Sequence, residues 1–108
     1  EAEAAYRRAL EIKPDYARAH YFRGLLYADA GYSKEALIHL RRAAGFEPGT
    51  AVFQAALGEA ALIQGEREEA RRAFGRALSL KPVSEEAARR IKERLAELAV
   101  QKPGNSRQ

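Results

Sequence analysis

The chain has 108 residues, of which 46% are hydrophobic and 31% are charged, and its formal net charge is +4. A chain of this composition is too apolar and too balanced in charge to be a disordered segment, and at this length we expect one compact domain. Because it contains no cysteine, a disulfide framework and a thiolate metal site are both excluded. No run of residues is long and apolar enough to be a transmembrane segment.

The chain begins with two helix patterns. Residues 1–13 carry apolar side chains at the spacing of an amphipathic helix, which Pro14 ends. A second helix is expected over about 15–30, with Asp15 as its N-cap. Gly31 can take the left-handed conformation that closes this helix.

The same signals continue through the middle of the chain. Ser33 is expected to cap a third helix over 34–46, which stops at the turn sequence of residues 47–49. A fourth helix is expected over 51–64, and it ends at a glycine, Gly65, as the second helix does.

The last part of the chain holds two more expected helices and a tail. A fifth helix over 67–80 precedes Pro82, and a sixth runs from about Ser84 to residue 100. The Ser84 hydroxyl can cap the sixth helix, whose single narrow apolar stripe is typical of a terminal capping helix. This stripe consists of Ala88, Ile91, Leu95 and Leu98. Residues 101–108 have no periodicity and are expected to form a flexible tail.

One pattern recurs every 34 residues along the chain. Its three copies begin at Glu1, Glu35 and Glu69 and end at Pro14, Pro48 and Pro82. Self-similarity at such a fixed period predicts stacked helical hairpins, each of which buries its apolar face against its neighbours. Small residues such as Gly24 and Gly58 would let helices approach closely. The space between hairpins is expected to be filled by Tyr6, Leu40 and Phe74.

The repeated residues also resemble the signature of a known family. Leu57-Gly58-x-x-Ala61, Ala70-x-x-x-Phe74 and Pro82 stand at signature positions of the tetratricopeptide repeat (TPR) family. Three residues depart from that signature, since His20 and Gln54 replace its Trp and Arg23 replaces its Leu. The chain is therefore similar to the TPR family over residues 1 to about 100.

The resemblance implies an all-α fold, an α-solenoid of antiparallel helix hairpins that winds into a TPR superhelix. About two and a half repeats and a C-terminal capping helix are expected within 1–100. The expected divisions are the second helix of a truncated repeat at 1–14, full repeats at 15–48 and 49–82, the capping helix at 83–100, and the flexible tail at 101–108.

In TPR domains the first helices of successive repeats line a concave groove that receives a peptide or a partner helix. By resemblance, the partner-binding residues of this groove are expected to be Arg18, Tyr21, Leu25, Asp29, Val52, Ala55, Glu59, Ile63 and Arg89. Tyr21 is the expected anchor, so Tyr21→Ala should weaken binding and leave stability nearly unchanged. An alternative interpretation is that Leu25 and Val52 complete the core.

The function implied by the resemblance is a protein–protein interaction scaffold that is not an enzyme. One alternative is a TPR appendage of a larger enzyme, where it would select the substrates. Another is a self-association module in which the apolar side of residues 1–13 contacts a second copy of the chain. The positions with which some family members clamp a chaperone tail hold mostly other residues here, so we do not expect that partner.

Nothing in the sequence indicates catalysis, a cofactor or a metal site. His20 and His39 are the two imidazoles of the chain. We expect His20 to be a partly buried packing residue and His39 to lie at the solvent edge. A phosphate-binding loop, a nucleophile elbow and a His-x-x-x-His pair are all absent from the sequence.

Arginines recur along the second helices and would form a basic stripe on the convex face. They are Arg7, Arg8, Arg41, Arg42, Arg72 and Arg76. Acidic residues interleave with them and no aromatic residue lies among them to stack on a base, so we expect a solvated surface and no nucleic-acid partner. Replacing Arg41 and Arg42 by Gln should then change stability by only a few tenths of a kcal/mol, roughly. The sequence does not identify a compartment, and the cytoplasm is the default expectation.

Overall fold

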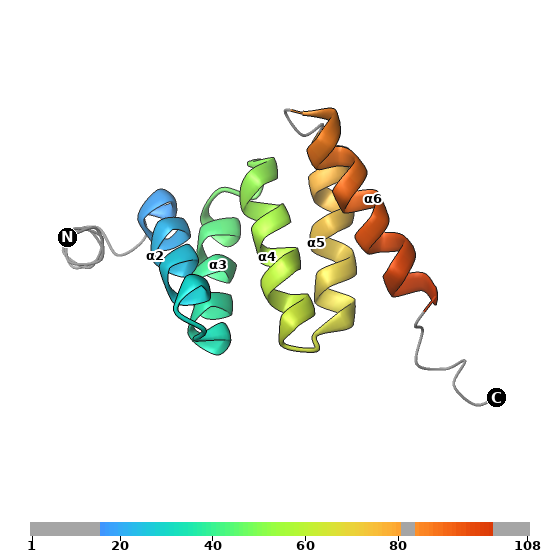
Figure 1. The fold of residues 1–108 in the computed structure, drawn as a ribbon. Helices are drawn as coiled ribbons and strands as arrows, with labels where there is room; N and C mark the ends of the chain where they lie inside the picture. The colour runs from blue at the N-terminus through green and yellow to red at the C-terminus, as the bar shows by residue number, and fades with distance from the viewer. Residues whose placement is uncertain (1–15, 81–83, 101–108) are drawn as a thin grey trace.

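The computed structural model describes residues 16–80 and 84–100, and within these two ranges every regular element is an α-helix (Figure 1). The helices are α2 (Ala17–Asp29), α3 (Ser33–Phe46), α4 (Ala51–Ile63), α5 (Arg67–Ser79) and α6 (Glu85–Val100). Their bounds agree closely with the ranges expected from the sequence, which confirms the all-α fold. The helix expected at 1–13 and the tail expected at 101–108 lie outside the described residues. No helix within 16–80 or 84–100 is long and apolar enough to span a membrane.

The helices form antiparallel hairpins that stack in chain order (Figure 1). Helix α2 packs on α3 and α4 packs on α5 within the two hairpins, while α3 contacts α4 and α5 contacts α6 between neighbouring units. The array is elongated, with principal extents of 50 × 28 × 20 Å. An array in which each hairpin contacts only its neighbours is an α-solenoid, as the 34-residue period predicts.

Each hairpin turn is closed by a glycine in the left-handed conformation, which confirms the prediction from the sequence. Gly31 has a φ of 89° and Gly65 a φ of 80°, values that residues with a Cβ rarely adopt. The backbone N–H of Tyr32 donates to the carbonyl of Tyr27 at 2.8 Å, and the second turn has the same bond 34 residues later. These bonds satisfy carbonyls at the end of the first helix of each hairpin.

Inside each hairpin, a bulky side chain of the second helix lies against a glycine of the first. A Cβ at Gly24 would lie 2.8 Å from Cγ of Leu40, and a Cβ at Gly58 would lie 2.7 Å from Cε1 of Phe74. The close approach expected at these glycines is therefore confirmed. Leu40 and Phe74 are 2% and 0% exposed, and each fills the interior of its own hairpin. The prediction that they fill the space between hairpins is therefore corrected.

The expected helix caps are borne out at one helix and wrong at another. Ser33 is the first residue of α3, and the N-cap position belongs to Tyr32, where no side chain makes a capping hydrogen bond. At α6 the prediction is confirmed, because the backbone N–H of Ala87 donates to Oγ of Ser84 at 3.0 Å. Asp15, the expected cap of α2, lies outside the described residues.

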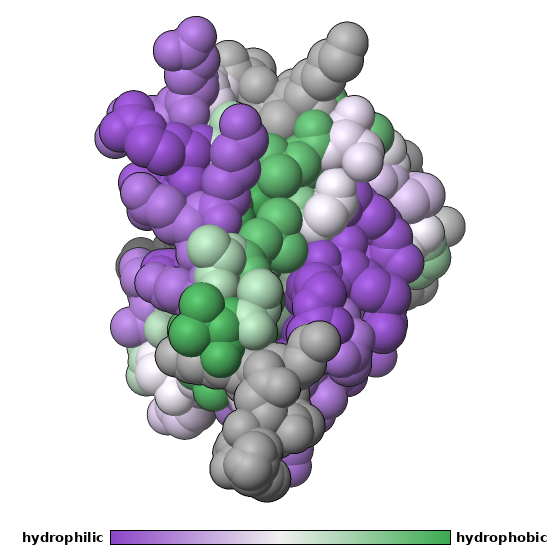
Figure 2. Space-filling model, turned by 90° about the vertical axis from the view of Figure 1, so that its right-hand side faces the viewer, coloured by the Kyte–Doolittle hydropathy of each residue, from purple (hydrophilic) through white to green (hydrophobic). Residues whose placement is uncertain are grey.

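Helix α6 covers one end of the stacked hairpins with its apolar side. Ile91 and Leu98 are 4% and 1% exposed, and Arg67 of α5 donates to the carbonyl oxygen of Leu98 at 2.7 Å. Figure 2 faces this end and shows a narrow apolar strip with hydrophilic side chains on both sides. The half-buried Leu95 and the exposed Val100 are apolar residues of α6 that remain in contact with water.

Candidate functional site

The residues expected to bind a partner lie on α2, α4 and α6, the helices that stand at the first position of successive 34-residue units (Figure 1). Three of them are apolar side chains in contact with water, since Leu25 is 37%, Val52 49% and Ile63 67% exposed. The interpretation that Leu25 and Val52 complete the core was therefore wrong. The exposed charged members of the set are Arg18, Asp29 and Arg89.

Tyr21 and Ala55 are half-buried and pack against the hydrophobic core. The ring of Tyr21 lies 4.8 Å from the ring of Phe53 on α4 and 5.1 Å from the ring of Phe22, measured between centroids. Burial raises the pKa of the Tyr21 hydroxyl above its ordinary value, so the hydroxyl stays neutral. Tyr21 is thus part of the packing between α2 and α4, so we now expect its removal to lower stability, where the sequence had predicted nearly unchanged stability.

A cavity of about 240 Å³ lies where α2 and α4 begin. Three of the expected groove residues, Arg18, Tyr21 and Val52, line it together. Sequence reasoning missed its other lining residues, which are Tyr16, Phe22, Glu47, Thr50 and Phe53. Four of the eight are aromatic, and no periodic pattern marks them, because they come from two helix starts and the loop between hairpins.

An ion pair joins α4 to α6. Nε of Arg94 donates to Oε2 of Glu59 at 3.1 Å, and Nη1 of Arg94 lies 3.6 Å from Oε1 of Glu97. The bond to Glu59 holds the pKa of Arg94 above its ordinary value. Glu59, an expected groove residue, is therefore already paired, and its partner Arg94 is a residue that the sequence did not single out.

Family models match most of the described chain. The model for the tetratricopeptide repeat matches residues 17–50 and 52–84, and a second model for the TPR repeat matches residues 1–31. The chain belongs to the tetratricopeptide repeat family. TPR domains are generally protein-interaction modules without catalytic activity. No curated protein matches the chain closely enough to count as a relative.

Solved TPR structures superpose on most of the chain. The type III secretion translocator chaperone SycD of Yersinia enterocolitica has a TM-score of 0.83 and 19% identity, over 93% of this chain and 71% of SycD. SycD has also been solved in complex with a peptide of the translocator YopD. MamA has a TM-score of 0.76 and 23% identity, over 90% of this chain and 57% of MamA. At these sequence identities, the similarities to SycD and MamA show only that the fold is shared.

The Thermobaculum terrenum O-GlcNAc transferase is more similar in sequence. Its structure has 32% identity and a TM-score of 0.76 over 86% of this chain, which spans 18% of the transferase. The chain thus corresponds to a small part of that enzyme and to about half of MamA.

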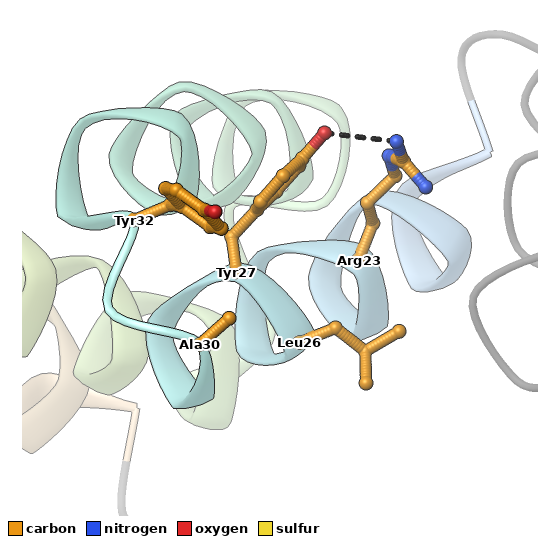
Figure 3. A pocket seen from close by; sticks show the side chains of 5 residues that line it. All are labelled: Arg23, Leu26, Tyr27, Ala30 and Tyr32. Atoms are coloured by element: carbon orange, nitrogen blue, oxygen red, sulfur yellow. Dashed lines mark hydrogen bonds between the residues drawn. The ribbon is translucent and has the colours of Figure 1, made fainter.

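A second cavity, on another side of α2, is too small for a peptide side chain. It has a volume of about 60 Å³ and is lined by Arg23, Leu26, Tyr27, Ala30 and Tyr32 (Figure 3). Arg23 stands at the position of the TPR signature's Leu. Its Nη2 donates to the hydroxyl of Tyr27 at 2.8 Å, and its guanidinium carbon lies 4.9 Å from the centre of the Tyr27 ring. The volume is enough for about two water molecules, so we do not include this cavity in the binding site.

The two histidines lie together beside this cluster, which corrects the expectation for one of them. His20 is only 2% exposed, more deeply buried than expected, and its Nδ1 lies 3.1 Å from Nδ1 of His39. His39 is half-buried and stacks on the ring of Tyr27, so part of its ring stays in contact with water, as expected for a residue at the solvent edge. Burial, followed by the positive charges around it, lowers the pKa of His39 to about 4. Within 16–80 and 84–100, no group of three potential metal ligands is present.

The basic stripe is also not a purely solvated surface. Nε and Nη2 of Arg41 donate to the two carboxylate oxygens of Glu69, each at 2.8 Å, and so join α3 to α5. This bidentate bond lowers the pKa of Glu69. Arg71 makes a similar contact to Glu68, although both belong to α5. Arg41 therefore ties neighbouring hairpins together, contrary to the expectation for this face.

Proposed function

We propose that the chain is a protein-interaction scaffold that binds a peptide or a partner helix along the groove of α2, α4 and α6. The observation that carries the proposal is the exposure of Leu25, Val52 and Ile63, three apolar side chains at groove positions. Single exposed apolar residues are common, but apolar residues gathered at the positions where TPR domains receive partners favour a binding surface. Charges of both signs at Arg18, Asp29 and Arg89 surround them.

Such a groove suits an amphipathic partner. An extended or helical segment can place apolar side chains on the exposed floor and polar side chains toward the charged rim. Because the floor is shallow and a flexible peptide loses conformational entropy on binding, we expect dissociation constants of roughly 1–100 μM.

A matched pair of isoleucine variants tests this proposal. Peptides are selected from a random display library on the purified chain, and their affinities are then measured for Ile63→Arg and Ile38→Arg. Both isoleucines are exposed, but Ile63 belongs to α4 on the groove, whereas Ile38 belongs to α3, the second helix of its hairpin. Binding should fall about tenfold or more for Ile63→Arg and remain unchanged for Ile38→Arg. Equal affinities for both variants would contradict groove binding.

A second function has one observation in its favour, which is the 32% identity with part of an O-GlcNAc transferase. In that case the chain would be the TPR part of a larger enzyme, and its groove would hold protein substrates for an attached catalytic domain. In the full-length protein, Ile63→Arg should then raise KM for a protein substrate and leave kcat for a small substrate unchanged.

Self-association through residues 1–13 stays a prediction, because these residues lie outside the part of the chain that the structure describes. Sedimentation at several protein concentrations can test it.

A further inference from the structure

The cavity of about 240 Å³ where α2 and α4 begin has the size and lining of a pocket for one large apolar side chain. It is smaller than the roughly 300–1,000 Å³ of pockets that hold whole drug-sized ligands. The rings of Phe22 and Phe53 both pack against the ring of Tyr21 in its wall, which gives the pocket a defined shape. Tyr16 and Val52 are 44% and 49% exposed and would lose contact with water when the pocket fills.

Arg18 and the two helix starts at the pocket favour a negative group beside that side chain. Arg18 lines the cavity, and none of the carboxylates in the described residues pairs with it. It lies in the first turn of α2, where the positive end of the helix dipole makes a cation unfavourable for folding. Glu47 is the acidic residue among the lining residues, and its Oε1 already accepts a hydrogen bond from Oγ1 of Thr50 at 3.2 Å.

The second wall of the pocket adds to this preference. It is formed by the start of α4, whose first turn also lacks an acidic residue. The positive ends of two helices and one unpaired guanidinium therefore converge on one apolar cavity. A cation at a helix start costs stability unless it has a partner, so a binding role for Arg18 would explain its position.

We propose that this cavity receives one aromatic or large aliphatic side chain of a peptide, and that an acidic residue within two positions of it in the peptide pairs with Arg18. The inference rests on the proposed binding of peptides in the groove and names the peptide class. In an extended peptide, residues within two positions lie about 3–7 Å away along the strand, which is within the reach of an arginine side chain. The recognised element is therefore a short acidic and apolar motif.

The test uses heptapeptides from a random display library, selected on the wild-type chain and on Arg18→Glu. The wild type should enrich an aromatic or large aliphatic residue flanked by Asp or Glu. With Arg18→Glu, the flanking preference should change to Lys or Arg, and the affinity for the wild-type peptides should fall about five- to tenfold. The variant is expected to fold, because a glutamate suits the first turn of a helix. Lys34→Glu is the matched control, since it makes the same change of charge in α3 and should alter neither the preference nor the affinity.

Val52→Trp tests the cavity itself, because an indole at its rim would occupy the space of the ligand's side chain. It should remove the preference for a large apolar residue. Arg18→Gln keeps the test decisive if Arg18→Glu misfolds, because it should abolish the acidic preference without reversing it.

Four results would overturn the inference, and the first two separate it from the proposed function. If the selected peptides lose affinity with Ile63→Arg but bind Arg18→Glu and Val52→Trp as the wild type does, groove binding stands and the pocket does not. If they bind all of these variants equally, both proposals fail. Enrichment of basic flanking residues by the wild type would also contradict the role of Arg18. Binding of a second copy of the chain at this pocket, detected as a dimer that Val52→Trp dissociates, would overturn the assignment to a peptide.

Discussion

Gly58 of α4 has no Cβ, and this allows the ring of Phe74 on α5 to lie close against the α4 backbone. The Phe74 ring is fully buried, and three of its carbons would lie within 2.9 Å of a Cβ at position 58. A buried aromatic ring held on all sides cannot move aside without displacing its neighbours. Gly75, next to it in the chain, faces open space instead.

Gly58→Ala and Gly75→Ala should therefore have opposite effects. Alanine favours a helix over glycine by about 1 kcal/mol in both cases, but at position 58 the overpacking costs about 1–3 kcal/mol. We expect Gly58→Ala to lower the free energy of unfolding by up to about 2 kcal/mol and Gly75→Ala to raise it by about 0.5–1 kcal/mol. Urea denaturation measures both values. Stabilisation by Gly58→Ala would show that the ring has room to shift.

The burial of His39, together with the positive charges around it, makes stability depend on pH. The pKa of His39 is about 4 in the folded chain and 6.5 ordinarily, so the unfolded chain binds more protons between these values. Stability should therefore fall as pH is lowered from 6.5 toward 4, by about 1–2 kcal/mol, which is less than for a fully buried group because water reaches part of the ring. In His39→Gln this part of the pH dependence should disappear. If the melting temperature changes with pH in the same way for the wild type and for His39→Gln, the assignment to His39 is contradicted.

Tyr21 contributes both to the packing of α2 on α4 and to the cavity wall. Tyr21→Ala should lower the free energy of unfolding by about 2–4 kcal/mol, somewhat less than for a fully buried aromatic residue, and should also weaken peptide binding. Tyr21→Phe keeps the ring and should retain nearly all of the stability. Calorimetric melts compared with peptide titrations measure both effects, and an unchanged melting temperature for Tyr21→Ala would contradict a packing role.

The junctions between hairpins combine apolar packing with ion pairs that bridge from one unit to the next. Arg41 of α3 holds Glu69 of α5, and Glu59 of α4 holds Arg94 of α6. The residues 34 positions before Arg41 and Glu69 are Arg7 and Glu35, so the first pair of side chains belongs to the repeated pattern. The second pair does not, because Leu25 and Ala60 stand 34 positions before Glu59 and Arg94. The Glu59–Arg94 pair therefore adjusts a single junction.

Arg41→Gln should destabilise the stack more than Arg42→Gln does. The bidentate bond of Arg41 to Glu69 is partly exposed, so we expect a loss of about 0.5–1 kcal/mol that shrinks at high salt. Arg42 is exposed and its replacement should change stability by less than about 0.3 kcal/mol. Denaturation in low and high salt tests both. Equal effects would mean that the bridge contributes nothing to the junction.

The stacked architecture was predictable from the sequence because it depends on residues that recur at a fixed spacing. Gly31 and Gly65 mark the hairpin turns, and the helix periodicity marks the bounds of the elements. The groove positions followed from the same register. By contrast, the pairing of Arg94 with Glu59 and the aromatic cavity join side chains that are far apart in the sequence and do not repeat. Such contacts depend on the packing of individual side chains, which periodicity does not determine.

The same register has a consequence for the α6 end of the molecule. Lys92, an exposed residue, stands 34 positions after Gly58, where the first two units have a glycine. A further helix could not approach α6 there as Leu40 and Phe74 approach their glycines. This agrees with the expected capping role of residues 83–100, which remains a proposal.

The location of peptide binding can be measured directly by NMR. A peptide selected on the wild-type chain is titrated into ¹⁵N-labelled protein, and the changes in the amide resonances are mapped onto the helices. The proposed scaffold function predicts that the largest changes fall on α2 and α4, around Arg18, Leu25, Val52 and Ile63, with smaller changes on α6. Changes concentrated on the exposed faces of α3 and α5, with the groove residues unaffected, would contradict it.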